Sequence, residues 1–168
     1  MGGNYKLVLE PNWEIEKIQK STFTKKENQA ILISENDHYP RVYYKMRDRN
    51  TDMLLYIEKT YVGIDSLYYM NVPHTNFTVI VLTFMVCIFD YCNNVVVSTI
   101  KIRTCCQKMI YQNSNLYLVC ETEILKYQLE TLKCMGEFKL PEIICDTEQI
   151  DHKLILHLYD KSSVTIDL

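Results

Sequence analysis

The longest apolar run in the chain lies near its middle, within residues 77–102, FTVIVLTFMVCIFDYCNNVVVSTIKI. Every residue from Val79 to Phe89 except Thr83 is apolar, and β-branched and aromatic side chains dominate the run. Such side chains suit a pleated, packed surface better than a helix. The run therefore predicts two central strands, Val79–Phe89 and Val95–Ile102, that are buried on both faces. Asn93-Asn94 predicts a tight turn between them, because Asn tolerates a positive φ.

The same run is too short to form a membrane-spanning helix. Such a helix needs about 20 apolar residues, whereas Asp90 ends this run and further polar residues follow it. The sequence therefore predicts no membrane partner. In a central hairpin Asp90 would lie at the turn, exposed and tolerant of substitution. An acid in place of Val81 would be buried without a partner.

Two-residue alternation of apolar and polar side chains marks the N-terminal part of the chain. Arg41–Arg47 places three apolar side chains on one face, and Met53–Lys59 repeats the pattern after a polar five-residue loop. This pattern predicts an antiparallel hairpin with one solvated face. Trp13–Lys20 alternates less regularly, so at most one short helix is expected near the N-terminus.

Two stretches near the C-terminus are similar to each other. Asn115–Cys120 matches Lys153–Leu158 at an offset of 38 residues, and the apolar positions that follow each stretch match at an offset of 39. Each copy predicts a hairpin, and their spacing is close to that of propeller blades. A third stretch from Phe77 is similar in apolar character only and is not counted as a copy. The repeats favour an antiparallel meander and leave a sandwich, a barrel and blade-like hairpins open.

Length and composition are typical of one globular domain. The chain has 168 residues, of which 48% are hydrophobic and 23% are charged. A chain of this length can bury enough apolar surface to fold without a metal or a disulfide. The sequence therefore predicts one all-β, predominantly antiparallel domain over residues 1–168. Within it we expect N-terminal hairpins in residues 1–73, and the central hairpin with the two repeated hairpins in residues 74–168.

Charge and glycine content exclude several functions. The net charge is −3, and the basic residues are scattered along the chain. Nucleic acids are bound through clustered positive charge, so no nucleic-acid partner is predicted. Only four glycines are present, with no cluster beyond Gly2-Gly3. The glycine-rich loops that bind nucleotide phosphates are therefore absent, and no cofactor is predicted.

The reactive side chains form no recognisable site. The seven cysteines include no C-x-x-C pair, so no metal site is predicted. His152 and His157 are five residues apart along a predicted strand and would point to opposite faces. No serine or cysteine has the sequence surroundings of a known nucleophile, so no catalytic residue is predicted and binding is favoured over catalysis. Cys105 and Cys106 follow two cationic residues, which leaves the reactivity of one of them open.

Carboxylates gather in the C-terminal third of the chain. They form a candidate partner-binding face of six residues: Glu121, Glu123, Glu142, Asp146, Glu148 and Asp151. An acidic face would bind a basic partner through charge complementarity. Because the cysteines show no disulfide framework and no cleavable signal is recognised at the N-terminus, a cytoplasmic location is expected.

Three functions are compatible with these patterns. The favoured one is a cytoplasmic, non-catalytic protein-interaction module, of which a toxin-neutralising immunity-type inhibitor is a specific form. The first alternative is a small-ligand-binding β-barrel, or an enzyme whose pocket leaves no mark in the sequence. The second is a structural oligomeric β protein that forms a dimer or larger assembly through its edge strands.

Overall fold

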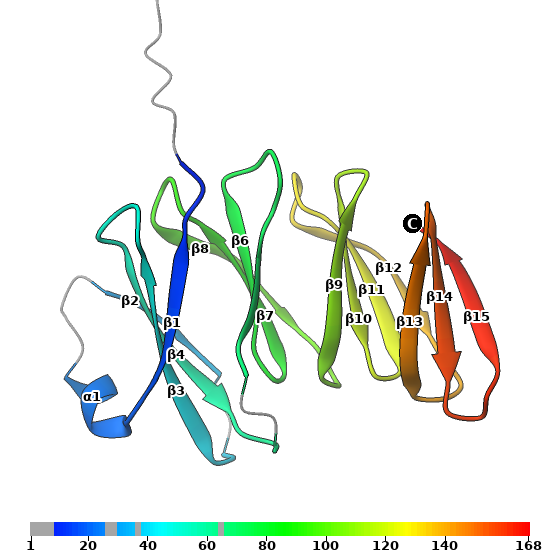
Figure 1. Cartoon of the computed structure of the whole chain (residues 1–168), viewed down its shortest axis with the longest axis horizontal. Helices are drawn as coiled ribbons and strands as arrows, with labels where there is room; N and C mark the ends of the chain where they lie inside the picture. Colours follow the sequence, from blue (N-terminus) through cyan, green and yellow to red (C-terminus); the bar gives the residue numbers. More distant parts are fainter. Residues whose placement is uncertain (1–8, 26–29, 36–37, 64–65) are drawn as a thin grey trace, which may run out of the picture. The chain divides into compact units, whose positions relative to one another are not determined.

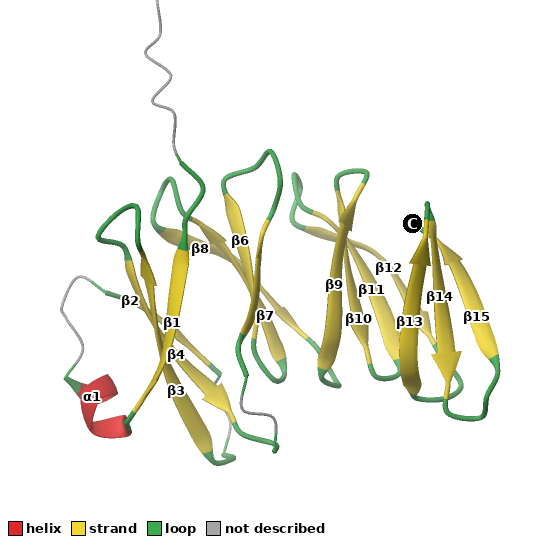
Figure 2. Ribbon diagram, in the orientation of Figure 1, coloured by secondary structure: helices red, strands yellow, loops and turns green. Residues whose placement is uncertain are grey.

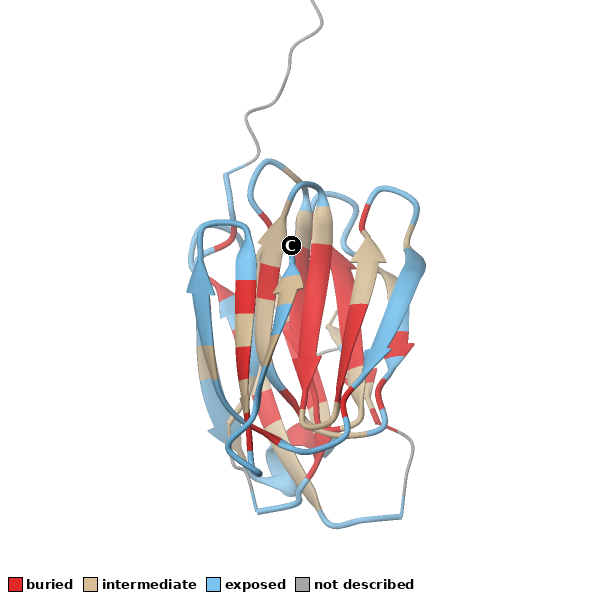
Figure 3. Ribbon diagram, turned by 90° about the vertical axis from the view of Figure 1, so that its right-hand side faces the viewer, coloured by how far each residue is buried: buried red, intermediate tan, exposed pale blue. Residues whose placement is uncertain are grey.

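The computed structural model describes residues 9–25, 30–35, 38–63 and 66–168. These residues group into two compact units, Met1–Lys101 and Ile102–Leu168. The described chain is nearly all β, with four mostly antiparallel sheets and one short helix near the N-terminus (Figures 1 and 2). The strands carry most of the buried residues (Figure 3). The prediction of an all-β, predominantly antiparallel fold is confirmed.

The first sheet contains the predicted N-terminal hairpin. Its strands, in spatial order, are β1 (Trp13–Ile18), β3 (Arg41–Asp48), β4 (Leu54–Thr60) and β2 (Ile31–Ser34). The β3–β4 hairpin forms because its alternating apolar side chains all reach one face, and β2 then adds to β4 in parallel. The helix is α1 (Lys20–Thr24), and its Phe23 ring contacts the rings of Tyr43 and Tyr56 on the other face of the sheet. The short helix expected near the N-terminus is present, but the segment that begins at Trp13 forms strand β1 and the helix follows this strand.

The second sheet is a four-stranded meander. Its strands are β5 (Tyr68–Asn71), β6 (Phe77–Val81), β7 (Met85–Asp90) and β8 (Val95–Lys101), paired in sequence order. It packs against the first sheet through a shared core that includes Met46, Leu55, Ile80 and Phe89. Two mostly antiparallel sheets that face each other across one apolar core therefore make up the first unit.

The central apolar run corresponds to three strands rather than the predicted two. Val79–Phe89 is interrupted by a turn at residues 82–84, where the Leu82 backbone N–H donates to the Met85 carbonyl at 2.8 Å. Leu82 and Thr83 are themselves buried, so the turn needs no polar surface residues. Residues Val79–Phe89 are nevertheless mostly core, as predicted, and Val81 is buried among them. The prediction that the second strand is buried on both faces is wrong, because β8 is mostly half-buried or exposed and Val95 is 45% exposed.

The second unit also contains two sheets. The third sheet pairs β9 (Cys106–Gln112), β10 (Asn115–Cys120), β11 (Glu123–Gln128) and β12 (Lys133–Lys139) as a meander. The fourth sheet has three strands: β13 (Ile144–Ile150), β14 (Lys153–Leu158) and β15 (Ser163–Asp167). The two sheets share a core that includes Val119, Ile124, Leu154 and Leu156.

The sheets repeat with a regular spacing along the chain. The first strands of the last three sheets begin at Tyr68, Cys106 and Ile144, which are 38 residues apart. Their second strands begin at Phe77, Asn115 and Lys153, again 38 residues apart. The two predicted C-terminal hairpins are therefore present, and the stretch from Phe77 is a third copy that the sequence comparison discounted. Consecutive antiparallel meanders of this kind are the sheets from which propeller blades are built.

Candidate binding site

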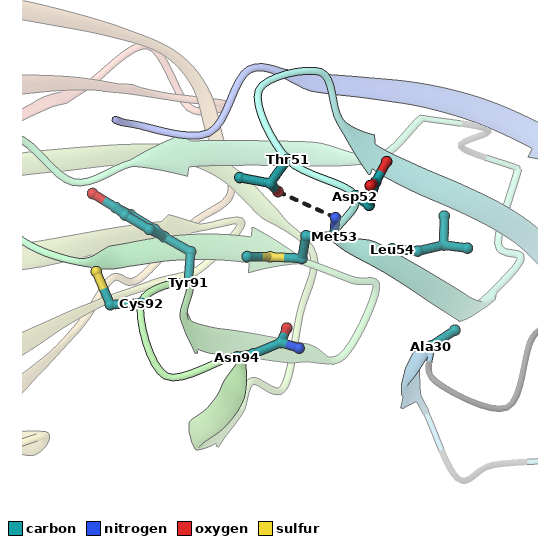
Figure 4. Close-up of a pocket in the computed structure, with 8 residues that line it drawn as sticks. All are labelled: Ala30, Thr51, Asp52, Met53, Leu54, Tyr91, Cys92 and Asn94. Atoms are coloured by element: carbon teal, nitrogen blue, oxygen red, sulfur yellow. Dashed lines mark hydrogen bonds between the residues drawn. The ribbon is translucent and has the colours of Figure 1, made fainter. Parts of the chain in front are cut away.

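The first unit contains a recess of about 480 Å³ between turns of its two sheets (Figure 4). Eight residues line it: Ala30, Thr51, Asp52, Met53, Leu54, Tyr91, Cys92 and Asn94. They come from three separate places in the sequence: the residue before β2, the β3–β4 loop and the β7–β8 turn. The recess is therefore built by the fold and not by one contiguous motif.

A buried carboxylate shapes the β3–β4 loop. Oδ1 of Asp48 accepts hydrogen bonds from the backbone N–H groups of Asn12 at 2.7 Å and Asn50 at 3.1 Å. Its Oδ2 accepts from the Thr51 hydroxyl at 2.7 Å, and the Thr51 oxygen in turn accepts from the Met53 N–H at 3.1 Å (Figure 4). A charged acceptor with three donors fixes a loop strongly. The wall of the recess formed by Thr51 and Met53 is thus preorganised.

A second carboxylate shapes the β7–β8 turn in the same way. Oδ1 of Asp90 accepts from the backbone N–H groups of Cys92 at 2.9 Å and Asn93 at 3.0 Å, and Oδ2 accepts from Asn93 Nδ2 at 2.7 Å. Asp90 is only 8% exposed. The expectation that Asp90 is exposed is therefore wrong, because its carboxylate points inward and accepts hydrogen bonds from its own turn. From these bonds we expect that its substitution is not tolerated without a loss of stability. Asn94 follows with φ of 56°, a left-handed conformation that Asn tolerates.

Tyr91 and Cys92 form the opposite wall of the recess. The Tyr91 hydroxyl donates to the Thr75 carbonyl at 2.8 Å, which ties the β7–β8 turn to the β5–β6 turn. Burial, and secondarily the charge of Asp90, raises the pKa of the Cys92 thiol. A raised pKa lowers the thiolate fraction, so this thiol is not set up as a nucleophile.

The chemistry of the recess is that of a polar contact surface. Its one carboxylate, Asp52, is exposed and forms a solvent-screened ion pair with Arg47 at 3.6 Å. Throughout the ranges that the structure describes, no three His, Cys, Asp or Glu side chains are arranged to hold a metal ion. In the same ranges, no helix is both long enough and apolar enough to cross a membrane. The recess offers hydroxyl, amide and aromatic groups on rigid turns.

The six residues of the predicted acidic face fall in different environments. Glu123 is 5% exposed at the start of β11, so its side chain is not part of a surface. Glu121 is half-buried in the turn before β11. The other four are exposed on or beside β13: Glu142, Asp146, Glu148 and Asp151. The structure thus gathers four of the six residues, and their role in binding stays a prediction.

The cysteines and histidines that the sequence singled out form no catalytic arrangement. Cys106 pairs in register with Cys120 on the neighbouring strand, and both thiols are buried. A hydrogen bond from Cys120 lowers the pKa of Cys106, and the same bond raises that of Cys120. Cys105, whose reactivity the sequence leaves open, is half-buried. His157 is half-buried on β14, with Nδ1 3.1 Å from the Ser163 hydroxyl.

Sequence reasoning missed the recess, although one local signal for it exists. Asp48, Asn50 and Thr51 are close in sequence, and Asp followed by Asn or Thr is typical of turns in which the carboxylate binds backbone N–H groups. Asp90 with Asn93 repeats the signal. What the sequence does not reveal is that these two turns, about 40 residues apart, meet at one cavity.

No protein-family model matches the chain, and no curated protein is similar to it in sequence. Among solved structures, it is similar to the computationally designed Ika4 protein, with a TM-score of 0.51, 10% identity and coverage of 85% of this chain and 94% of that chain. It is similar to Saccharomyces cerevisiae Sqt1, with a TM-score of 0.57 and 13% identity. That match covers 95% of this chain and 47% of Sqt1, so this chain spans about half the length of Sqt1.

A further similarity is to the β-propeller domain of Myceliophteria thermophila Cps50 (Swd1), with a TM-score of 0.46, 13% identity and coverage of 60% of this chain and 36% of that chain. At these identities the comparisons concern the fold alone. Because unrelated functions share such folds, function has to be argued from the sites.

Proposed function

We propose that this chain is a non-catalytic protein-interaction module that contacts its partner with the turns around the recess of the first unit. The observation that carries the proposal is the pair of buried carboxylates, Asp48 and Asp90. Their hydrogen bonds hold the β3–β4 loop and the β7–β8 turn in place. Binding surfaces are commonly made of loops held by a rigid scaffold. Preorganised turns also reduce the entropy lost on binding.

The exposed groups around the recess suit a protein surface better than a small substrate. Thr51, Asp52, Cys92 and Asn94 are all exposed, and none of them is placed for proton transfer or nucleophilic attack on a bound molecule. Hydroxyl and amide side chains adapt their hydrogen bonding to a partner. Tyr91 is buried and supports the recess from within, because its ring belongs to the core and its hydroxyl binds the Thr75 carbonyl.

A finer form of the proposal concerns the chemistry of the partner. Asp146 and Glu148 alternate along β13 and share one face, with Asp151 in the turn that follows. We propose that this acidic surface attracts a basic partner, as a toxin-neutralising inhibitor in the cytoplasm would. The support for it is the exposure of these carboxylates, whose steering effect falls as salt rises.

The proposal is tested by comparing partner recovery for variants of the two surfaces. We would purify the tagged chain from its cells of origin and quantify co-purifying proteins by mass spectrometry. Cys92→Arg places a bulky charge at the mouth of the recess without removing a hydrogen bond made by the Cys92 side chain, and should reduce partner recovery about tenfold or more. A matched control, Glu130→Arg, changes an exposed residue of the second unit and should leave recovery unchanged.

Reversal of Asp146, Glu148 and Asp151 to Lys addresses the finer form. For a basic partner we expect a loss of association rate that is large at low salt and small at high salt.

Equal recovery with wild-type protein and Cys92→Arg would refute the proposed role of the recess. Salt-independent binding by the triple variant would refute the basic partner alone.

A further inference from the structure

The two sheets of the second unit differ in their number of strands. Lys108 Nζ of β9 donates to the Thr147 hydroxyl of β13 at 3.2 Å, so β13 lies opposite β9. In the same order, β14 lies opposite β10 and β15 lies opposite β11. The sheet β9–β12 has a fourth strand, β12, and no described strand of the sheet β13–β15 lies opposite it. All seven residues of β12 are exposed, and Phe138 on the face toward β15 is 48% exposed. One strand position over β12 is therefore uncovered.

Along the edge of the three-stranded sheet at this position, several backbone groups have no partner among the described residues. The Leu168 N–H donates to the His152 carbonyl at 2.7 Å, and the Leu158 N–H donates to the Ser162 carbonyl at 2.9 Å. Backbone bonding alternates along antiparallel strands, so the even-numbered residues of β15 bond to β14. The backbone groups of Ser163, Thr165 and Asp167 then point away from the sheet. β15 presents three N–H and three C=O groups along an open edge.

A groove of about 190 Å³ lies between this edge and β12. It is lined by Tyr117, Ile124, Lys126, Gly136, Glu137, Phe138, Ile166 and Asp167. Tyr117 is 2% exposed, and its hydroxyl has no hydrogen-bond partner in the described part of the chain. A buried hydroxyl left unpaired is costly, so a ligand that supplies an acceptor would be stabilised there.

The groove has one cationic and one apolar end. Lys126 Nζ lies 5.3 Å from the centre of the Tyr117 ring and forms no ion pair with a described residue. Glu137, a carboxylate on the lining of the groove, forms ion pairs with Arg103 at 3.7 Å and with Lys139 at 3.5 Å. Lys126 pairs in register with Gly136 of β12. Phe138 lies two residues further along β12 and forms the apolar end of the groove.

The strand directions relate these ends to β15. Gln112 contacts His152, so the β9–β10 and β13–β14 turns lie at the same end of the unit. Lys126 and Gly136 are nearer that end than Phe138 is, and Ile166 is nearer it than Val164 is. A side chain opposite Ile166 would therefore lie at the level of Lys126, and one opposite Val164 at the level of Phe138.

We propose that the edge of β15 and the groove over β12 bind an extended segment of a partner protein as a fourth, antiparallel strand. Its backbone pairs with Ser163, Thr165 and Asp167, as in other cases of strand addition. Its inward-facing residues alternate with outward ones: a carboxylate opposite Ile166 binds Lys126 and the Tyr117 hydroxyl, and an apolar side chain opposite Val164 packs on Phe138.

A second copy of this chain fits the same edge poorly. Antiparallel pairing of β15 with its own copy requires a two-fold axis perpendicular to the sheet, which keeps the second sheets of both copies on one side. Because β12 extends one strand position beyond β15, β12 of one copy would overlap β11 of the other. A single strand has no second sheet and avoids this overlap.

The test uses the full chain and a synthetic peptide, acetyl-Lys-Thr-Glu-Thr-Val-Thr-Lys-amide, whose Glu and Val fall opposite Ile166 and Val164 in the antiparallel register. Binding is followed by NMR, with hydrogen exchange of the backbone amides. We expect the peptide to slow exchange at Ser163, Thr165 and Asp167. Replacing its Glu by Lys should weaken binding about tenfold, the equivalent of about 1.4 kcal/mol.

Two variants of the chain separate the edge from the groove. Thr165→Pro removes one N–H that the fold does not use and should weaken peptide binding about fivefold, whereas Thr165→Ala keeps the N–H and should not. Gly136→Leu fills the groove, and because a Cβ there meets nothing within 4 Å the fold should be retained. It should weaken binding about tenfold or more. Circular dichroism and the thermal midpoint establish that each variant is folded.

Three results would overturn the proposal. The first is a failure to see peptide binding at the groove. It would appear as unchanged hydrogen exchange at the amides of Ser163, Thr165 and Asp167 with millimolar peptide, or as peptide binding that neither Thr165→Pro, Gly136→Leu nor the Glu-to-Lys peptide changes. The second is protection of the Thr165 amide in the free monomer, which would mean that the chain already covers the edge. The third is a concentration-dependent dimer that buries it. The inference rests on the proposed protein-binding role, but Cys92→Arg should not change peptide binding, so the two can fail separately.

Discussion

Replacing Asp90 by Ala should destabilise the first unit measurably. The substitution removes an acceptor of three hydrogen bonds, two from backbone N–H groups and one from Asn93 Nδ2. Bonds to a charged acceptor contribute about 1.5–3 kcal/mol each when the donors are buried. Here Cys92 and Asn93 are exposed, so water replaces the carboxylate in part. We therefore expect a loss of about 2–3 kcal/mol in the free energy of unfolding, and not the full sum.

Urea unfolding followed by tryptophan fluorescence measures this loss, because Trp13 packs edge-on against Phe89 in the same core, with ring centroids 6.2 Å apart. The thermal midpoint should fall by roughly 4–12 °C, since 1 kcal/mol corresponds to about 2–4 °C in a chain of this length. Asp90→Asn keeps one acceptor oxygen and should lose less. Asp52→Ala, whose carboxylate is fully exposed, is the matched control and should change stability by less than about 0.5 kcal/mol. A loss for Asp90→Ala as small as that of Asp52→Ala would show that the buried carboxylate does not hold the turn.

Three other perturbations probe the core and the thiols. Val81→Asp should abolish soluble expression, because it places an unpaired charge in the core, and soluble, folded protein in the supernatant would contradict the assignment of Val81 to that core. Glu35→Ala should cost about 3 kcal/mol or more in urea unfolding, because it removes the hydrogen bonds that the buried carboxylate accepts from the Thr60 and Phe84 N–H groups at 2.7 and 2.5 Å. A change below about 1 kcal/mol would contradict this. Burial raises the pKa of Cys87 to about 12, so at pH 8 only about one thiol in 10,000 is ionised and iodoacetamide should leave it unmodified in the folded chain. Peptide mapping should show exposed Cys134 and Cys145 alkylated before Cys87, and early modification of Cys87 would be inconsistent with its burial.

The strands with one solvated face could be predicted from the sequence. Alternation identified the hairpin of β3 and β4 because one face of it is core and apolar side chains recur at every second position. The C-terminal hairpins were found through their similarity to each other. In each case polar turn residues separate one strand from the next, and in the β3–β4 loop and the β14–β15 turn these residues are exposed.

Where turns are buried, this signal disappears. The turn at residues 82–84 is made of Leu82, Thr83 and Phe84, so β6 and β7 read as one long strand and the third repeat was not counted. The opposite error occurred at Asp90. An acid in a turn suggests exposure, but hydrogen bonds from its own turn make burial favourable.

The sites were less predictable than the strands. The recess joins two turns that are distant in sequence, and the groove over β12 arises from a difference in strand number between two sheets. Neither property belongs to a local stretch of residues. The sequence did indicate exposed acids near β13, but it included Glu123, which strand pairing places inside.

The central claim is that the turns around the recess contact a partner protein. Its most direct test is a photo-crosslinking amino acid at position 52, which is exposed and lines the recess, in the full chain expressed in its cells of origin. We predict one dominant crosslinked protein from position 52, at a yield at least about tenfold above that from position 130. Equal yields at the two positions, or no crosslinked protein from position 52, would contradict the account.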